Sequence, residues 1–314
     1  MSRLDLFSIG SWTIFDHILR MARLPSNGET VPLDMPIAEI DAVHYGDCSA
    51  NIAAVAARLG LRTGLGMVVG GDFDTSGYRA HLEALGVDLA GVEARDGERS
   101  GHSYNFFDGA NGSFCVSHLG VAAEQGDFRP PLALIGSSRA LVVNEMFSDY
   151  TLGAIEYAQA KGVLTAINGM VATAGEGATR FLAAADTLFL SRGECRALLE
   201  AQGVAGPGDL LARGPRLVVV TEGSDGSLWY DTGGVTRVPA VQTTAFVDST
   251  GAGDSFVAGA LFGLLRDMST AEAGRVAATV ASFVVEAWGC QTNLPTEEQM
   301  RERYRAAFGD LPKP

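Results

Sequence analysis

Short apolar runs alternate with longer amphipathic or alanine-rich runs along most of the chain. The apolar runs predict strands at 4–10, 63–69, 140–144, 163–167, 187–191 and 216–221. Helical periodicity marks the runs between them, and several of these end at a glycine. They predict helices at 49–60, 75–86, 151–162 and 194–203. Nearly continuous apolar strands separated by helices predict an α/β fold whose mostly parallel sheet is covered on both faces.

Two regions interrupt this alternation. Residues 11–47 contain the turn LPSNGETV and then the extended-looking run IAEIDAVHY. Residues 97–118 have a hairpin pattern, with HSYNFF and SFCVSH on either side of DGANG. These strands predict a small sheet that stands off the core as a lid, although an antiparallel edge of the main sheet would give the same pattern. We expect one domain over 1–314, with lid segments at about 11–47 and 97–118.

Composition and charge narrow the class of protein. The 314 residues, 47% of them hydrophobic, are enough to bury a sizeable core. A formal net charge of −14 argues against nucleic acid or an anionic membrane as a partner, because both attract basic surfaces. The four cysteines are not spaced like metal or redox motifs, and the first residues, MSRLDLFSIGSW, show no secretory signal. We therefore expect a cytoplasmic protein with reduced thiols and no membrane span.

The stretch VDSTGAGDSFVAGALFGLL, residues 247–265, carries the strongest chemical signal. We expect TTAFV to lead into it as a strand, DSTGAGD to turn, and SFVAGALFGLL to form an apolar helix. The unpaired N–H groups of a helix N-terminus can hold an anion where small residues, here Gly251, Ala252 and Gly253, leave room. Asp254 would then accept a proton from a hydroxyl that attacks a phosphoryl group. A glycine turn followed by a favourable first-turn acid would give the same residues.

Other nucleotide-binding classes lack their motifs in this chain. There is no GxxxxGK[ST] sequence, and Lys161 and Lys313 are the only lysines, which argues against a P-loop NTPase or a protein kinase. The first strand is followed by SWTIFDH rather than GxGxxG, which argues against an N-terminal dinucleotide fold and an NAD-dependent enzyme.

Six segments in this order resemble the ribokinase-like, or PfkB-type, carbohydrate and nucleoside kinases, over nearly the whole chain. They are GSWTIFDHILRMARLPSNGETV, GDCSANIAAVAARLG, VVGGDFDTSGYRAHLEALGVD, TEGSDGSLWY, VDSTGAGDSF and GCQTNLP. The resemblance implies a ribokinase-like three-layer sandwich with a mostly parallel central sheet and a small β-strand lid. It also implies an ATP-dependent kinase that transfers the γ-phosphoryl group to a hydroxyl of a neutral sugar or nucleoside. A sugar-phosphate kinase and a catalytically silent sugar or nucleotide sensor are the alternatives.

The resemblance implies a role for each matching position. Asp254 would be the base, and Gly251, Ala252 and Gly253 would form the anion hole. The positions that match substrate-binding residues are Asp16, Gly46, Asp47 and Asn51; turn and helix-cap duty is the alternative for Asp16 and Asn51. Those that match the nucleotide-contacting turn are Thr221, Gly223 and Gly226.

The resemblance also implies cofactors besides ATP. Glu194 matches an acid that organises Mg²⁺ around the phosphates through water, although a first-turn acid on a helix is the commoner explanation for such a residue. Asp248, with the loop from Gly289 to Asn293, matches a region where relatives often hold a monovalent cation, so K⁺ is a further expected cofactor.

The chain departs from the family pattern at three places. Asp47 replaces the second of two glycines, the segment between Gly10 and Asp16 is one residue longer, and Ser191 stands where an asparagine is usual. GDCSAN has no cationic side chain for a second phosphate, which favours a neutral acceptor, while Arg95 and Arg99 near the lid leave a sugar phosphate open.

The lid segments suggest two further features. His102, Tyr104 and Phe106 alternate along one lid strand, and either face the substrate or pack the lid against its neighbour. A lid that closes over the acceptor would keep water from the transferring phosphoryl group. Exposed strand edges would also allow a homodimer to form through the lid.

Overall fold

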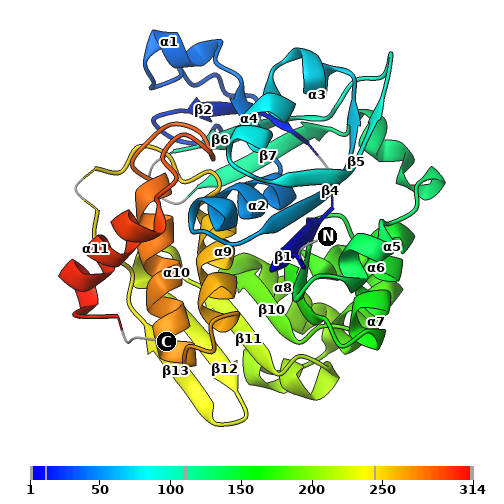
Figure 1. Ribbon diagram of the computed structural model, residues 1–314. Coiled ribbons are helices and arrows are strands. Elements are labelled where there is room, and N and C mark those ends of the chain that lie inside the picture. Colours follow the sequence, from blue (N-terminus) through cyan, green and yellow to red (C-terminus); the bar gives the residue numbers. More distant parts are fainter. Residues whose placement is uncertain (1–2, 11–12, 109–111, 244, 312–314) are drawn as a thin grey trace.

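The computed structural model describes residues 3–10, 13–108, 112–243 and 245–311. Its core is a nine-stranded sheet (Figure 1) in the order β13 (Gly234–Val238), β12 (Ser227–Asp231), β11 (Leu217–Thr221), β10 (Thr187–Ser191), β9 (Leu164–Asn168), β8 (Ala140–Asn144), β1 (Leu6–Ile9), β4 (Thr63–Gly70) and β5 (Asp88–Arg95). The strands from β11 to β5 pair in parallel, while β12 and β13 join antiparallel at one edge. The predicted mostly parallel sheet is therefore confirmed.

Helices cover both faces of this sheet. Side chains alternate between the two faces along each strand, and apolar side chains on both faces need a covering layer. On β1, Leu6 packs into one apolar cluster and Phe7 into the other. One face carries α5 (Leu132–Gly136), α6 (Asp149–Ala160), α7 (Ala178–Ala183) and α8 (Arg192–Gln202). The other carries α2 (Cys48–Arg58), α3 (Asp72–Thr75), α4 (Tyr78–Ala84), α9 (Ala252–Leu264), α10 (Thr270–Val284) and α11 (Glu297–Phe308) (Figure 1). Short 3₁₀ turns lie at η1 (Gly120–Asp127), η2 (Val171–Gly177), η3 (Pro207–Arg213) and η4 (Gly223–Asp225).

A second, four-stranded sheet stands above the first (Figure 1). Its order is β3 (His44–Tyr45), β2 (Phe15–Arg20), β6 (His102–Phe107) and β7 (Ser113–His118). Strands β6 and β7 form the predicted antiparallel hairpin. The inserted strands are thus a small separate sheet, as the lid hypothesis expects, and not an edge of the main sheet.

Several element predictions need correction. The run IAEIDAVHY begins with a short helix, α1 (Ile37–Ile40), after Pro36, whose fixed φ suits the position before a first turn, and only its end pairs as β3. The described part of 243–247 forms no strand, because the Val247 N–H donates to the Val285 carbonyl at the end of α10 instead. The helix expected at 75–86 begins only at Tyr78, as α4, because Gly77, with a φ of 85°, separates it from the short helix α3.

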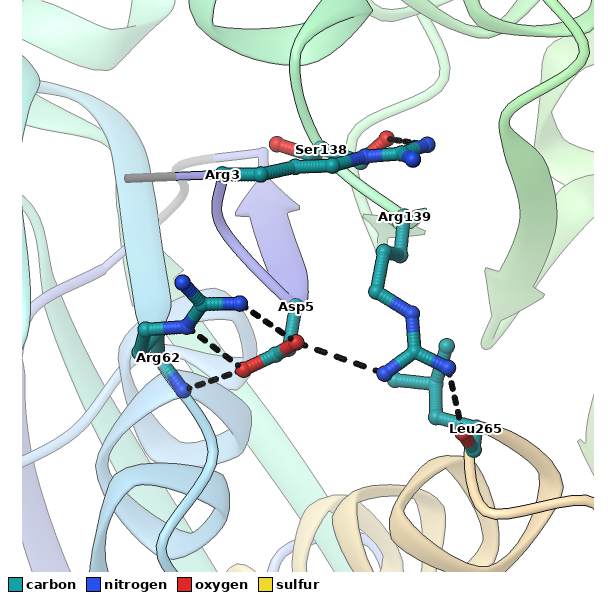
Figure 2. Close-up of polar contacts among 6 residues, drawn as sticks. All are labelled: Arg3, Asp5, Arg62, Ser138, Arg139 and Leu265. Carbon is teal, nitrogen blue, oxygen red and sulfur yellow. Dashed lines mark hydrogen bonds and ion pairs between the residues drawn. The ribbon is translucent and has the colours of Figure 1, made fainter. Parts of the chain in front are cut away.

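Ion pairs connect the amino ends of three neighbouring strands (Figure 2). Asp5, Arg62 and Arg139 directly precede β1, β4 and β8. The Arg62 Nε donates to Asp5 Oδ2 at 3.1 Å, and an Arg139 N–H donates to Asp5 Oδ1 at 3.3 Å. These arginines lower the pKa of Asp5 to about 2 despite its burial. The ion pairs thus hold the sheet at the end opposite its carboxyl edge. Within the described ranges, no helix combines the length and apolar character that crossing a membrane requires.

Candidate active site

Polar side chains gather at the carboxyl edge of the main sheet. Asn144, Asn168, Ser191 and Thr221 are the last residues of four neighbouring parallel strands, β8 to β11. Ligands of open α/β sheets bind outside this edge. Two cavities lie here, one of about 380 Å³ under the lid and one of about 310 Å³ beside α9 and α10. We call them the lid cavity and the outer cavity.

The turn before α9 forms a wall of both cavities. Thr250, Gly251 and Asp254 line the lid cavity, whereas Ser249, Ala252 and Gly253 line the outer cavity. Gly251 has a φ of 76°, and a Cβ on it would lie 2.7 Å from the Cβ of Cys290. Only glycine fits this turn without displacing its neighbour. A group passing between the two cavities would cross the N-terminus of α9.

Asp254 is held by two amides. Its Oδ2 accepts from Asn51 Nδ2 at 2.9 Å and its Oδ1 from Asn168 Nδ2 at 3.1 Å. The side chain is buried, and burial raises its pKa to about 6, although hydrogen bonds from Asn51, Cys48 and Asn168 act in the opposite direction. A carboxylate with a pKa this close to neutrality suits a general base. Asn168 was not predicted from the sequence, because the contact joins residues 86 apart.

The amides of the turn are not equivalent. The Ala252 N–H donates to the Ser249 carbonyl at 3.1 Å. For the N–H groups of Gly253 and Asp254, no acceptor is found among the residues that the structure describes. These two amides therefore are the ones that α9 offers to an anion at its positive end.

Asp16 occupies the opposite side of the lid cavity. It is buried, with the Ser103 hydroxyl donating to Oδ1 and the Cys290 thiol donating to Oδ2 at 3.2 Å. Burial raises the pKa of this carboxyl above its ordinary value. A Cβ on Gly46 would lie 2.1 Å from Asp16 Oδ2, so the glycine makes room for the carboxylate. The contribution of Gly46 to the site is therefore the absence of a side chain, which leaves space for the Asp16 carboxylate.

Asp47 and Asn51 both have structural partners in addition to the cavity they line. Asp47 has a φ of 77° and caps α2, its Oδ1 accepting from the N–H of Ser49 at 2.8 Å and of Ala50 at 3.1 Å. Asn51 accepts from Gln291 Nε2 at 2.9 Å while it donates to Asp254. Asp47, which replaces the second glycine of the family's pair, therefore caps the N-terminus of α2. Asn51 positions the carboxylate of Asp254.

The structure corrects the expectation that His102 faces the substrate. Ser103 and Asn105 line the lid cavity, and alternation along β6 puts His102 on the other face of the lid sheet. There His102 contacts His17, with 3.2 Å between Nδ1 and Nε2, and Tyr104 stacks on His17. Of the two interpretations of this strand, packing of the lid is the one the geometry supports.

The predicted nucleotide turn lines the outer cavity. Thr221, Gly223 and Gly226 all belong to its wall, as do Ala252 and Gly253. Gly226 has a φ of 95°, and a Cβ there would lie 2.1 Å from the Val238 carbonyl oxygen, so no other residue fits. Much of the remaining wall is apolar, contributed by Ala240, Val241, Phe246, Phe256, Ala278, Ala281 and Val285. Such a wall suits the flat, apolar faces of a nucleobase.

Two glutamates, Glu145 and Glu194, interact electrostatically. Glu194 begins α8 in a capping box, accepting from the Ser191 N–H at 2.6 Å while its own N–H donates to Ser191 Oγ. Glu145 lines the lid cavity, and burial, together with the negative charges of Glu194, Asp254 and Asp47, raises its pKa to about 8. Glu145 was not predicted, although an Asn-Glu pair directly after the buried strand at 140–144 is a signal.

This acidic pair fits a hard divalent cation, which prefers carboxylate oxygens. Within the described part of the chain, no group of three or more His, Cys, Asp or Glu side chains is arranged to hold a metal directly. Two carboxyl groups can hold an ion that keeps most of its water, as Mg²⁺ does.

Asp248, Gly289 and Asn293 are brought together, but hydrogen bonds occupy them. Asp248 is fully buried; its Oδ1 accepts from the Thr250 N–H at 2.9 Å and hydroxyl at 2.7 Å, and its Oδ2 from the Gly289 N–H at 3.0 Å. Asn293 Nδ2 donates to the Phe283 carbonyl. Both carboxylate oxygens of Asp248 thus already accept from protein donors, and we derive no step from a cation there.

Comparison with known proteins decides the family. The pfkB family carbohydrate kinase domain matches residues 37–297. The chain belongs to this family. It is 31% identical over 311 residues to a nucleoside kinase of Methanothermobacter thermautotrophicus, covering 98% of each chain. It is 28% identical to a nucleoside kinase of Methanocaldococcus jannaschii over 93% of this chain and 94% of that one.

Solved structures agree with the fold. The crystal structure of the Methanocaldococcus jannaschii nucleoside kinase, described as an archaeal member of the ribokinase family, superposes with a TM-score of 0.84 at 24% identity, covering 98% of this chain and 100% of that one. A Burkholderia thailandensis nucleoside kinase in complex with inosine gives 0.85 at 20% identity, over 99% and 100%. The predicted ribokinase-like fold and the predicted ATP-dependent kinase with a sugar or nucleoside hydroxyl as acceptor are confirmed at this level.

Proposed function

We propose that this member of the pfkB family is a nucleoside kinase, with Asp254 as the base that activates the acceptor hydroxyl. The observation that carries the proposal is the lining of the lid cavity. Asp16, Asp47, Glu145 and Asp254 line it, and no lysine or arginine is found among its described lining residues. The lining thus offers no cationic side chain to a second phosphate, and the carboxylate of Asp254 would repel one, so the acceptor is neutral and rich in hydroxyls. The match to a nucleoside kinase over 98% of the chain supports this choice.

The size of the lid cavity favours a nucleoside over a free pentose. About 380 Å³ lies within the range of about 300–1,000 Å³ that is typical of sites for drug-sized molecules. Asp16 and Asn51 line its walls, and Ser103, Asn105, Cys115 and Ser117 line it from the lid. We infer that the ribose lies against Asp16 and Asp254, and that the polar lid residues contact the base.

The reaction follows from the shared wall of the two cavities. The ionised carboxylate of Asp254 takes the proton of the acceptor hydroxyl. The hydroxyl oxygen attacks the γ-phosphorus of ATP at the same time, and the bond between this phosphorus and the leaving oxygen of ADP breaks. The amides of Gly253 and Asp254, with the turn at Gly251 and Ala252, stabilise the charge on the transferring group. The lid covers the acceptor and keeps water from competing with it. Thr221, Gly223 and Gly226 hold the nucleotide in the outer cavity.

Mg²⁺ would be held near Glu194 and Glu145, through water, and would neutralise phosphate charge when bound. A monovalent cation at Asp248, Gly289 and Asn293 stays an untested prediction, as does a cytoplasmic location.

The homodimer also stays a proposal. The outer face of the lid exposes Tyr104, Phe114 and Val116, and β7 is an edge strand whose residues are all exposed. We infer that two lids pair through this face. Sedimentation of the protein and of Val116→Asp tests it: a dimer that the substitution dissociates supports the pairing, and a monomeric parent protein rejects it.

ADP release from Mg-ATP across nucleosides, free pentoses, hexoses and sugar phosphates tests the acceptor. We expect the highest kcat/KM with a nucleoside. A higher value with a free sugar would show that the lid cavity does not select the base, and turnover of sugar phosphates alone would contradict the argument from the cavity's charge.

A further inference from the structure

Cys290 lies where the lid, the core and the anion-binding turn meet. It is 1% exposed yet lines the lid cavity, and its thiol donates to Asp16 Oδ2 at 3.2 Å. Burial and the neighbouring carboxylates of Asp16 and Asp254 raise the pKa of this thiol well above its ordinary value. The sulfur therefore keeps its proton and remains a hydrogen-bond donor.

Asp16 has few partners of its own. It lies on β2, in the lid sheet, and Ser103, which donates to its other oxygen, lies on β6 of the same sheet. Ser103 in turn accepts from Asn105 Nδ2 at 2.8 Å. The bond from Cys290 is thus the one recorded side-chain hydrogen bond between Asp16 and the core, among the described residues.

The carboxylate of Asp248 accepts hydrogen bonds both from the backbone next to Cys290 and from the turn before α9. Asp248 accepts from the Gly289 N–H on one side and from Thr250 on the other. The side chain of Cys290 also packs against Gly251, where a Cβ would come within 3.0 Å of its sulfur. A continuous set of contacts therefore runs from the turn before α9, through Asp248 and Cys290, to Asp16.

We propose that Cys290 is a positioning residue, whose thiol orients the Asp16 carboxylate toward the acceptor and fixes it relative to the turn at Gly251. This role rests on the proposed function, because it assumes that Asp16 binds the acceptor. A carboxylate that loses one of two donors is free to rotate, so its hydrogen bonds to the acceptor weaken. The nucleotide, bound in the outer cavity, does not touch Asp16.

The kinetic test compares Cys290→Ala, which removes the donor, with Cys290→Ser, which keeps one. Cys195→Ala is the matched control, because Cys195 is a buried thiol on α8 that packs in a separate apolar cluster. We expect Cys290→Ala to raise the KM for the nucleoside about fivefold to tenfold, the effect of one weak hydrogen bond to a carboxylate, with the KM for ATP unchanged. Cys290→Ser should restore most of the loss. Equal nucleoside KM values in Cys290→Ala and the parent protein, or a loss that serine does not restore, would overturn the proposal.

The infrared S–H stretching band tests the contact without turnover. The difference spectrum between the parent protein and Cys290→Ala isolates the Cys290 band, and Cys195→Ala isolates a reference band. We expect the Cys290 band at lower frequency than the reference, because its proton is shared with a carboxylate, and we expect it to move in Asp16→Asn. A Cys290 band that is unaffected by Asp16→Asn overturns the contact itself. If no nucleoside is turned over but the band responds, the proposed function fails while the contact stands.

Discussion

Asn168→Ala should change the pH dependence of catalysis. Asn168 does not itself line the lid cavity, and its Nδ2 donates to Asp254 Oδ1 and to Asn144 Oδ1, each at 3.1 Å. Of these two acceptors only the carboxylate of Asp254 titrates, so a shift in the pH profile reports on the base. Asp254 accepts a proton only when it is ionised, and its pKa is about 6, so kcat/KM should fall as the pH falls through this value. Removing a donor to the carboxylate disfavours the ionised form and therefore raises the pKa.

The size of the change follows from the lost hydrogen bond. A hydrogen bond to a charged group contributes about 1.5–3 kcal/mol, and each factor of ten in a proton-binding constant is about 1.4 kcal/mol. Because Asn51 still holds the other oxygen and water can reach the vacated space, we take the lower value. The acid limb of kcat/KM should therefore move up by about 1 pH unit in Asn168→Ala.

The assay is initial ADP formation with the preferred nucleoside, measured between about pH 5 and pH 9 at low acceptor concentration. Ser117→Ala is the control, because Ser117 lines the same cavity from the lid and has no recorded contact with Asp254. Its acid limb should keep the midpoint of the parent protein. An acid limb that stays in place in Asn168→Ala, or moves to lower pH, would refute the assignment of this limb to Asp254.

Three further substitutions test other parts of the account. Gly46→Ala places a Cβ 2.1 Å from Asp16 Oδ2, so the nucleoside KM should rise at least about tenfold with the KM for ATP unchanged, whereas Gly153→Ala, in an open helix position, should leave both unchanged. Asp254→Asn should stabilise the protein at pH 8, because it removes a buried negative charge. The rise of the pKa from 3.8 to about 6 means that this charge destabilises the fold by about 3 kcal/mol, and about 1 kcal/mol of the gain is lost with one amide hydrogen bond that asparagine cannot accept. That gain should disappear as the pH falls from 6 toward 3.8 in thermal denaturation, since the protonated carboxyl carries no penalty; a gain that persists there would contradict the cause. Asp5→Asn should destabilise the protein at pH 7 by about 1–2 kcal/mol, a value reduced because the arginine partners of Asp5 are half-exposed (Figure 2). Urea denaturation should show this loss shrinking as the pH falls from 3.8 toward 2. If the variant loses no stability at pH 7, the ion pairs do not stabilise the sheet.

The elements that the sequence predicts best are the ones buried on both faces. All eight residues of β4 are buried, so the apolar run at 63–69 is nearly the whole signal. Edge elements carry a weaker pattern. β5 mixes exposed, partly buried and buried residues without a regular period, and β13 is largely exposed; neither was predicted. The run at 37–40 forms a helix with no buried residue, so no periodicity could identify it.

Local sequence motifs locate the site, but they do not give its contacts. The turn at 249–254 and the nucleotide turn are each contiguous in sequence, and both line the expected cavities. The bond from Cys290 to Asp16 joins residues 274 apart, so only the folded chain brings them together. His102 shows a different limit: alternation on a strand leaves two faces to choose from, and the pairing of Asp16 with Ser103 decides which face meets the cavity.

The most direct test of the central claim is the rate of ADP formation by Asp254→Asn with the preferred nucleoside and saturating Mg-ATP. Asparagine keeps the shape of the side chain and cannot take the proton of the acceptor. We predict a loss of about a thousandfold in kcat, with ATP affinity in titration calorimetry unchanged. A variant that turns over as fast as the parent protein would show that Asp254 is not the base, and the assignment of the turn before α9 to phosphoryl transfer would be wrong.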